Sequence, residues 1–143
     1  MRNESRQPTE RQDKAGGLGY NRELIGAAQA LRSIFGASGV ITGTAGADRS
    51  VAEGYAAARA CALTQLSVLK HALGSLDEIQ QIVSVNGYVN AVAGFPDSPA
   101  VINGASDLLL EVFGELGRHV RAAIGVSALP RNALVELQMI VAI

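Results

Sequence analysis

The C-terminal stretch of the chain decides how the fold is interpreted. It reads Arg121-Ala-Ala-Ile-Gly-Val-Ser-Ala-Leu-Pro130, followed by Arg-Asn-Ala-Leu-Val-Glu136-Leu-Gln-Met-Ile-Val-Ala-Ile143. Two runs rich in apolar residues flank a Pro-Arg-Asn turn, which predicts two strands forming a hairpin. Each strand holds one ionisable residue, Arg121 or Glu136. A charge among apolar residues is costly unless it is paired or used, so the two either pair across the hairpin or face one pocket.

The alternation of side chains along a strand divides each predicted strand into two faces. In the first strand, Arg121 shares its face with the small residues Ala123 and Gly125. Small neighbours leave space for a ligand beside the guanidinium, which matches a carboxylate with two parallel hydrogen bonds. A carboxylate such as Glu136 is able to hold a water molecule and accept its proton during attack on an imine carbon.

Composition narrows the class of protein. The chain has 143 residues, of which 48% are hydrophobic and 17% charged, as expected for one globular domain. A net charge of −1 gives no electrostatic reason to expect nucleic acid. The polar first 23 residues have no apolar signal core, no run is long enough for a membrane span, and the single Cys61 excludes an internal disulfide framework. We therefore expect a cytoplasmic protein without a metal, because His71 and His119 are isolated.

The remaining chain predicts one domain behind a tail. Residues 1–22 are polar and charged and predict a flexible tail, which leaves 23–143 as a single domain. Residues 23–37 carry a helical stripe weakened by a glycine, and residues 40–44 are a short strand candidate.

Capping and spacing predict two helices around a further strand. The first helix runs from Ser50 to residue 73, with a capping box formed by Ser50 and Glu53 and a stop at Gly74. Alternating residues predict a strand over 79–92. The second helix starts at Asp97 or Ser98, and its apolar stripe is Val101, Ala105, Leu108, Val112 and Leu116.

The resulting order is strand, helix, strand, helix, strand, strand. Such an order predicts an α+β fold, in which two helices cover one face of a mixed sheet. Too little chain remains to cover the other face, so we expect a partner subunit there.

Spacing in the C-terminal stretch resembles that of the RidA/YjgF family, also called the L-PSP endoribonuclease family. In that family a proline follows the arginine by nine residues and a glutamate follows it by fifteen, which matches Arg121, Pro130 and Glu136. Residues 82–89 and 101–108 resemble the family as well. The resemblance implies a chorismate-mutase-like α+β fold and a homotrimer with ligand clefts between subunits.

The resemblance also implies roles for particular residues. It assigns Arg121 to the substrate carboxylate, the backbone of Ala123 and the side chain of Asn103 to ligand contacts, and Glu136 to orienting a water. The chain departs from the family by having Ala122 and Ala123 where a serine or cysteine is typical. The family's early strand is also not visible before residue 38.

Three functions follow from the resemblance. The first is an enamine/imine deaminase that hydrolyses reactive 2-imino acids to 2-oxo acids and ammonia without a cofactor. The second is a non-catalytic trimer that binds a small carboxylate-bearing metabolite, which the missing early strand favours. An endoribonuclease is the least favoured, because the chain has neither a basic stripe nor a histidine-rich site.

Overall fold

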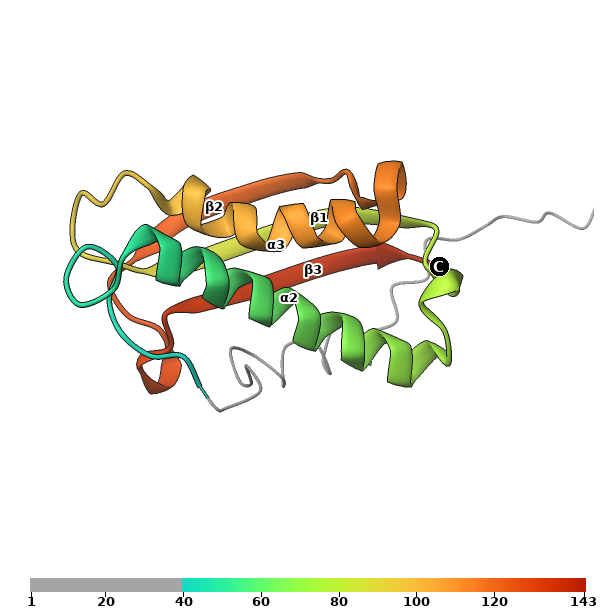
Figure 1. Ribbon diagram of the computed structural model, residues 1–143, viewed down its shortest axis with the longest axis horizontal. Helices are drawn as coiled ribbons and strands as arrows, with labels where there is room; N and C mark the ends of the chain where they lie inside the picture. Colours follow the sequence, from blue (N-terminus) through green and yellow to red (C-terminus); the bar gives the residue numbers. More distant parts are fainter. Residues whose placement is uncertain (1–39) are drawn as a thin grey trace, which may run out of the picture.

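The computed structural model describes residues 40–143, and the predicted tail 1–22 and ambiguous stretch 23–37 lie outside them. Two helices lie side by side across one face of a three-stranded sheet (Figure 1). The elements in chain order are α2 (Val51–Leu73), η1 (Leu76–Glu78), β1 (Gln81–Asn90), α3 (Ser98–Phe113), η2 (Gly114–Gly117), β2 (Val120–Val126), η3 (Pro130–Asn132) and β3 (Val135–Ala142). The predicted α+β fold is confirmed.

The order of strands in the sheet is β2-β1-β3, so the predicted C-terminal hairpin is wrong. Strand β1 pairs in parallel with β2 and antiparallel with β3. Helix α3 connects β1 to β2, and such a crossover places consecutive strands parallel and adjacent. Strand β3 then occupies the other edge of β1. The turn between β2 and β3 passes through Arg131 and Asn132, whose φ angles are 59° and 56°.

Local signals explain where the helices begin and end. The Ser50 hydroxyl accepts a hydrogen bond from the Glu53 N–H at 3.2 Å, and the Glu53 carboxylate accepts one from the Ser50 N–H at 2.8 Å. This is the predicted capping box. Helix α2 stops at Gly74, which adopts a φ of 84°. Helix α3 has Asp97 at its N-cap position and Pro99 in its first turn, although the Asp97 side chain makes no capping hydrogen bond.

Helices α2 and α3 pack with their backbones unusually close. A Cβ atom added to Gly104 of α3 would overlap the carbonyl oxygen of Tyr55 in α2. On the outer side of the pair, the Arg59 guanidinium donates two hydrogen bonds to the Glu111 carboxylate, at 3.1 and 2.6 Å. Small residues at the contact therefore fix the position of α3 relative to α2.

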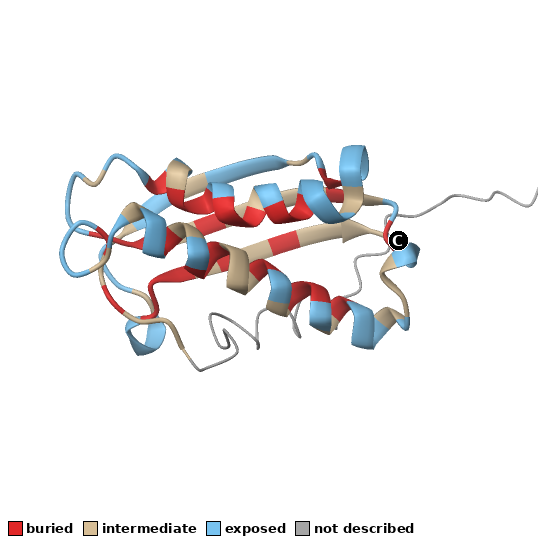
Figure 2. Ribbon diagram, in the orientation of Figure 1, coloured by how far each residue is buried: buried red, intermediate tan, exposed pale blue. Residues whose placement is uncertain are grey.

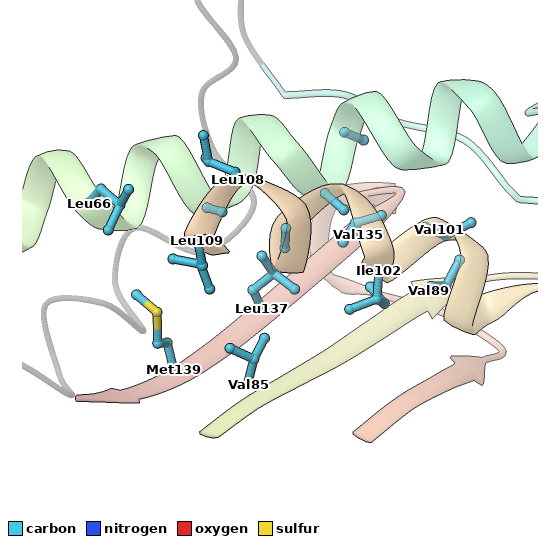
Figure 3. Close-up of a cluster of buried hydrophobic side chains, with 14 of the residues drawn as sticks. Leu66, Val85, Val89, Val101, Ile102, Leu108, Leu109, Val135, Leu137 and Met139 are labelled. Carbon is cyan, nitrogen blue, oxygen red and sulfur yellow. The ribbon is translucent and has the colours of Figure 1, made fainter. Parts of the chain in front are cut away.

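The core lies between the helix pair and the sheet. Figure 3 shows side chains from both helices meeting those of β1 and β3, including Leu66, Ile102, Leu109 and Leu137. The predicted stripe of α3 is confirmed at Val101, Ala105 and Leu108. It is wrong at Val112 and Leu116, which are 48% and 46% exposed because α3 ends at residue 113 and the chain turns there.

The predicted strand over residues 40–44 is replaced by isolated bridges. Thr42 pairs with Ala133, and Ala45 pairs with Ala91. The buried Asn90 side chain joins this segment to the turn before β3, because its Nδ2 atom donates to the Gly43 carbonyl at 2.9 Å and to the Oδ1 atom of Asn132 at 3.1 Å.

Candidate functional site

Arg121 lies on edge strand β2, on the face of the sheet that carries the helices. Arg121 is paired with Val85 of β1, whose side chain lies in the core under the helices. Paired residues on neighbouring strands point to the same face of the sheet, so the Arg121 side chain also points toward the helices. Its Nη1 atom donates to the Ser106 hydroxyl at 3.1 Å, and its Nη2 atom donates to the Pro99 carbonyl at 3.5 Å. A guanidinium has five N–H donors, so three remain for a ligand on this exposed side chain.

The residues beside Arg121 on the same face are small. Ala123 is half-buried and packs against the core, whereas Gly125 is exposed. Most of β2 is exposed along its length (Figure 2). A Cβ atom on Gly125 would lie 3.4 Å from the hydroxyl oxygen of Ser98, which is buried and has no hydrogen-bond partner among the described residues. The residues that follow Arg121 on this face are therefore small, and a buried hydroxyl lies beside the last of them.

Asn103 lies next to this strip on helix α3. Positions 99, 103 and 106 follow helical spacing and share one face, and Arg121 contacts residues at both ends of this set. Asn103 is exposed. The structure thus brings Arg121, Ala123 and Asn103 to one side of the sheet, as a shared ligand contact requires.

Glu136 does not join them within one chain. It is paired with Tyr88 of β1, three residues along from Val85, so Glu136 points to the face of the sheet opposite Arg121. Strand β1 also separates the two strands that carry these residues. Neither a direct pair across a hairpin nor a pocket shared within one chain fits this arrangement.

Two residues without a predicted role complete the surroundings of Arg121. The Nε2 atom of His119 lies 3.0 Å from the Ser106 hydroxyl oxygen, and its Nδ1 atom lies 2.6 Å from the Gly117 carbonyl oxygen. The sequence did contain a signal for His119, because alternation from Arg121 places residue 119 on the same side of the strand. Ser106 follows from the helical spacing after Asn103.

Comparison with known proteins gives the family. Residues 36–143 match the family described as "YjgF/chorismate mutase-like, putative endoribonuclease". The chain belongs to the YjgF/chorismate mutase-like family. It is 50% identical over 104 residues to Protein TCP17 of Trypanosoma cruzi, and this match covers 72% of the chain but only 65% of TCP17.

Solved structures of family relatives share the fold. The protein Atu1372 of unknown function from Agrobacterium tumefaciens is 35% identical, with a TM-score of 0.75, over 84% of this chain and 91% of Atu1372. A "putative endoribonuclease" from Shewanella oneidensis is 36% identical, with a TM-score of 0.74, over 78% of this chain and 76% of that protein. The two-helix, mixed-sheet arrangement is thus the YjgF/chorismate mutase-like fold.

The described part of this YjgF-family chain shows no sign of a reactive thiol, a metal site or a membrane span. Burial, and to a lesser extent the charge of Glu136, raises the pKa of the Cys61 thiol to about 12, which disfavours the reactive thiolate at neutral pH. Within residues 40–143, no three His, Cys, Asp or Glu side chains are placed to share a metal ion. In the same part of the chain, neither helix is both long and apolar enough to cross a membrane.

Proposed function

We propose that this protein is a cytoplasmic enamine/imine deaminase that converts 2-imino acids to 2-oxo acids and ammonia. The observation that carries the proposal is the placement of Arg121. Two acceptors on α3 hold its guanidinium beside the small residues Ala123 and Gly125, and three of its donors remain for a substrate. A planar, permanently charged group in such a position suits the carboxylate of a 2-imino acid.

The reaction requires a carboxylate anchor and a base. With the substrate carboxylate on Arg121, a water oxygen attacks the imine carbon and passes a proton to the base. The base returns this proton to the nitrogen, and the second water proton follows as the new hydroxyl becomes the carbonyl. The C–N bond breaks, ammonia leaves with the bonding electron pair, and a 2-oxo acid remains. The reaction needs no cofactor, because hydrolysis of an imine involves no net oxidation or reduction and water is the only co-reactant. Asn103 is assigned to orienting the substrate and Glu136 to holding the water.

Because Glu136 lies on the other face of its own sheet, we assign the base to a neighbouring copy. Val120 and Ile124, on the face of β2 opposite the helices, are 71% and 49% exposed. Apolar side chains on that face support contact between subunits. We further propose a closed homotrimer in which Arg121 of one subunit lies near Glu136 of the next, so that each cleft takes residues from two chains.

The first test is turnover. An amino-acid oxidase generates the imine in situ, semicarbazide traps the fraction that is not hydrolysed, and 2-oxo acid is measured. Arg121→Ala should lower kcat/KM about 10²- to 10⁴-fold, since two charged hydrogen bonds of roughly 1.5–3 kcal/mol each are lost. Arg118→Ala is the matched control, because Arg118 is exposed and its side chain pairs, among residues 40–143, with Glu115 at 2.7 Å. Equal activity in wild type and Arg121→Ala contradicts the proposal.

Mixed subunits test the shared cleft. Arg121→Ala and Glu136→Ala chains are each expected to be inactive alone. Co-refolding them produces interfaces at which an intact Arg121 meets an intact Glu136, so part of the activity should return. No recovery in mixtures that native mass spectrometry shows to contain hybrid trimers contradicts a cleft formed by two chains.

The alternative is a non-catalytic trimer that binds a small carboxylate-bearing metabolite. The separation of Arg121 from Glu136 favours it, because one chain holds the anchor without the assigned base beside it. Such a protein is stabilised by a 2-oxo acid by RT ln(1 + [L]/Kd) and shows no turnover. An RNA-cleaving activity that persists through purification and is lost in Arg121→Ala would instead favour the endoribonuclease that the family description names.

A further inference from the structure

A line of hydrogen bonds leads from the backbone to the guanidinium of Arg121. The Gly117 carbonyl, the His119 ring, the Ser106 hydroxyl and the Arg121 guanidinium follow one another at 2.6, 3.0 and 3.1 Å. These four groups come from different parts of the fold. Gly117 ends η2, His119 directly precedes β2, Ser106 lies in α3, and Arg121 lies in β2.

For a neutral His119 ring, the direction of every bond in this line follows from its first member. A carbonyl oxygen only accepts, so the Nδ1 atom of His119 must carry the proton that it donates to Gly117. The Nε2 atom of a neutral ring is then an acceptor, and the Ser106 hydroxyl donates its single proton to it. Ser106 is left with lone pairs only toward Arg121, whose N–H groups only donate. Each group is thus held in one orientation.

The start of the line is fixed by packing. Gly117 is buried, and a Cβ atom there would overlap the backbone of α3 at Leu109. Its carbonyl therefore cannot shift without moving η2 away from the helix. The same helix carries Ser106. Both hydrogen-bond partners of the His119 ring are therefore held in place by α3.

We propose that Ser106 and His119 are positioning residues that hold Arg121 ready for the substrate carboxylate. The identity of the ligand rests on the proposed function. The ordering of the Arg121 side chain by Ser106 and His119 does not depend on it. An exposed arginine has several rotatable bonds and loses much side-chain entropy when it binds. A guanidinium already ordered by Ser106 loses less, which favours binding without changing the chemical step.

The ordering is measured first, without any ligand. ¹⁵N relaxation of the Arg121 Nε–H group reports its order parameter in the full-length protein. We expect a high value in wild type, a clear fall in Ser106→Ala and His119→Ala, and a return toward wild type in Ser106→Thr, which keeps the hydroxyl. His71→Ala and Ser67→Ala, both exposed on α2, are the matched controls. An unchanged order parameter in Ser106→Ala overturns the positioning role, whatever the kinetics show.

The consequence for the substrate is measured second. In Ser106→Ala and His119→Ala we expect KM for the imino acid, or Kd for a 2-oxo acid, to rise about tenfold while kcat stays within about twofold. A matching fall in kcat with unchanged KM overturns the proposal. Wild-type protein that neither turns over an imine nor binds a 2-oxo acid overturns the proposed function and the ligand named here. The order parameters still decide the positioning role in that case.

Discussion

Replacing Gly104 with alanine tests how the close approach of the helices holds the fold together. Alanine is the better helix former by roughly 0.8–1.0 kcal/mol, so propensity alone predicts a more stable protein. The new Cβ atom, however, would overlap the Tyr55 carbonyl and lie 3.2 Å from the Arg59 backbone nitrogen. Backbone atoms cannot turn aside as a flexible side chain does, so the helices must separate.

The expected change in the free energy of unfolding is the difference between the packing cost and the gain in helix propensity. Overpacking costs about 1–3 kcal/mol, and we take the upper end because the obstacle is backbone. Subtracting the propensity gain leaves a loss of about 2 kcal/mol in the free energy of unfolding. For a domain of this size, that lowers Tm by about 8 °C. Gly54→Ala, whose Cβ would meet the Val101 side chain at 2.8 Å, should cost less because a side chain is able to shift.

Urea denaturation and calorimetry measure the effect, with Ser67→Ala as the control. Ser67 is exposed on α2, so the same kind of substitution there changes helix propensity alone and should raise stability slightly. A Gly104→Ala protein as stable as wild type would refute the reasoning, because it would mean that α3 moves away from α2 at no cost.

Three further predictions concern other parts of the fold. Ser50→Ala removes the capping box of α2 and should lower the free energy of unfolding by about 1 kcal/mol in urea denaturation. Asn90→Ala leaves the buried Gly43 carbonyl and the Asn132 side-chain oxygen without their donor and should cost about 2 kcal/mol, measured in the same way; a loss below about 0.5 kcal/mol would show that water replaces it. Cys61 should react with a thiol reagent at pH 8 more than about a hundredfold slower in the folded protein than in denaturant. Because burial raises the pKa of Cys61 from 9.0 to about 12, the unfolded chain releases this proton first, and Cys61 should lower stability as pH rises above 9.

Local patterns predicted the two helices and the three strands of the sheet, but not which strands are neighbours. The capping box at Ser50 and the stop at Gly74 placed α2 correctly, because these signals act within a few residues. The short turn before β3 suggested a hairpin. Strand alternation, however, is identical whether β3 pairs with β2 or with β1, so spacing alone does not determine the partner.

The same limit applies to the candidate site. Alternation correctly placed Arg121 on one face with Ala123 and Gly125, because a face depends only on the strand itself. The relation of Arg121 to Glu136 depends on sheet order and, in our proposal, on a second subunit. Neither is encoded in the fifteen-residue spacing that drew attention to the pair. The roles of these residues remain predictions.

The central place of β1 also has a consequence for how the chain folds. Its parallel pairing joins Ser84 to Val120, which are 36 positions apart, whereas even the shortest antiparallel pairing, that of Val89 with Val135, joins residues 46 apart. Closing a longer loop costs more chain entropy, although the cost grows slowly. We expect the β1-α3-β2 unit to form first and β3 to dock last. Until β3 docks, one edge of β1 has unpaired backbone groups, and part of the apolar surface of the helices is exposed. The rate of this last step therefore determines how long the newly synthesised chain is prone to aggregate.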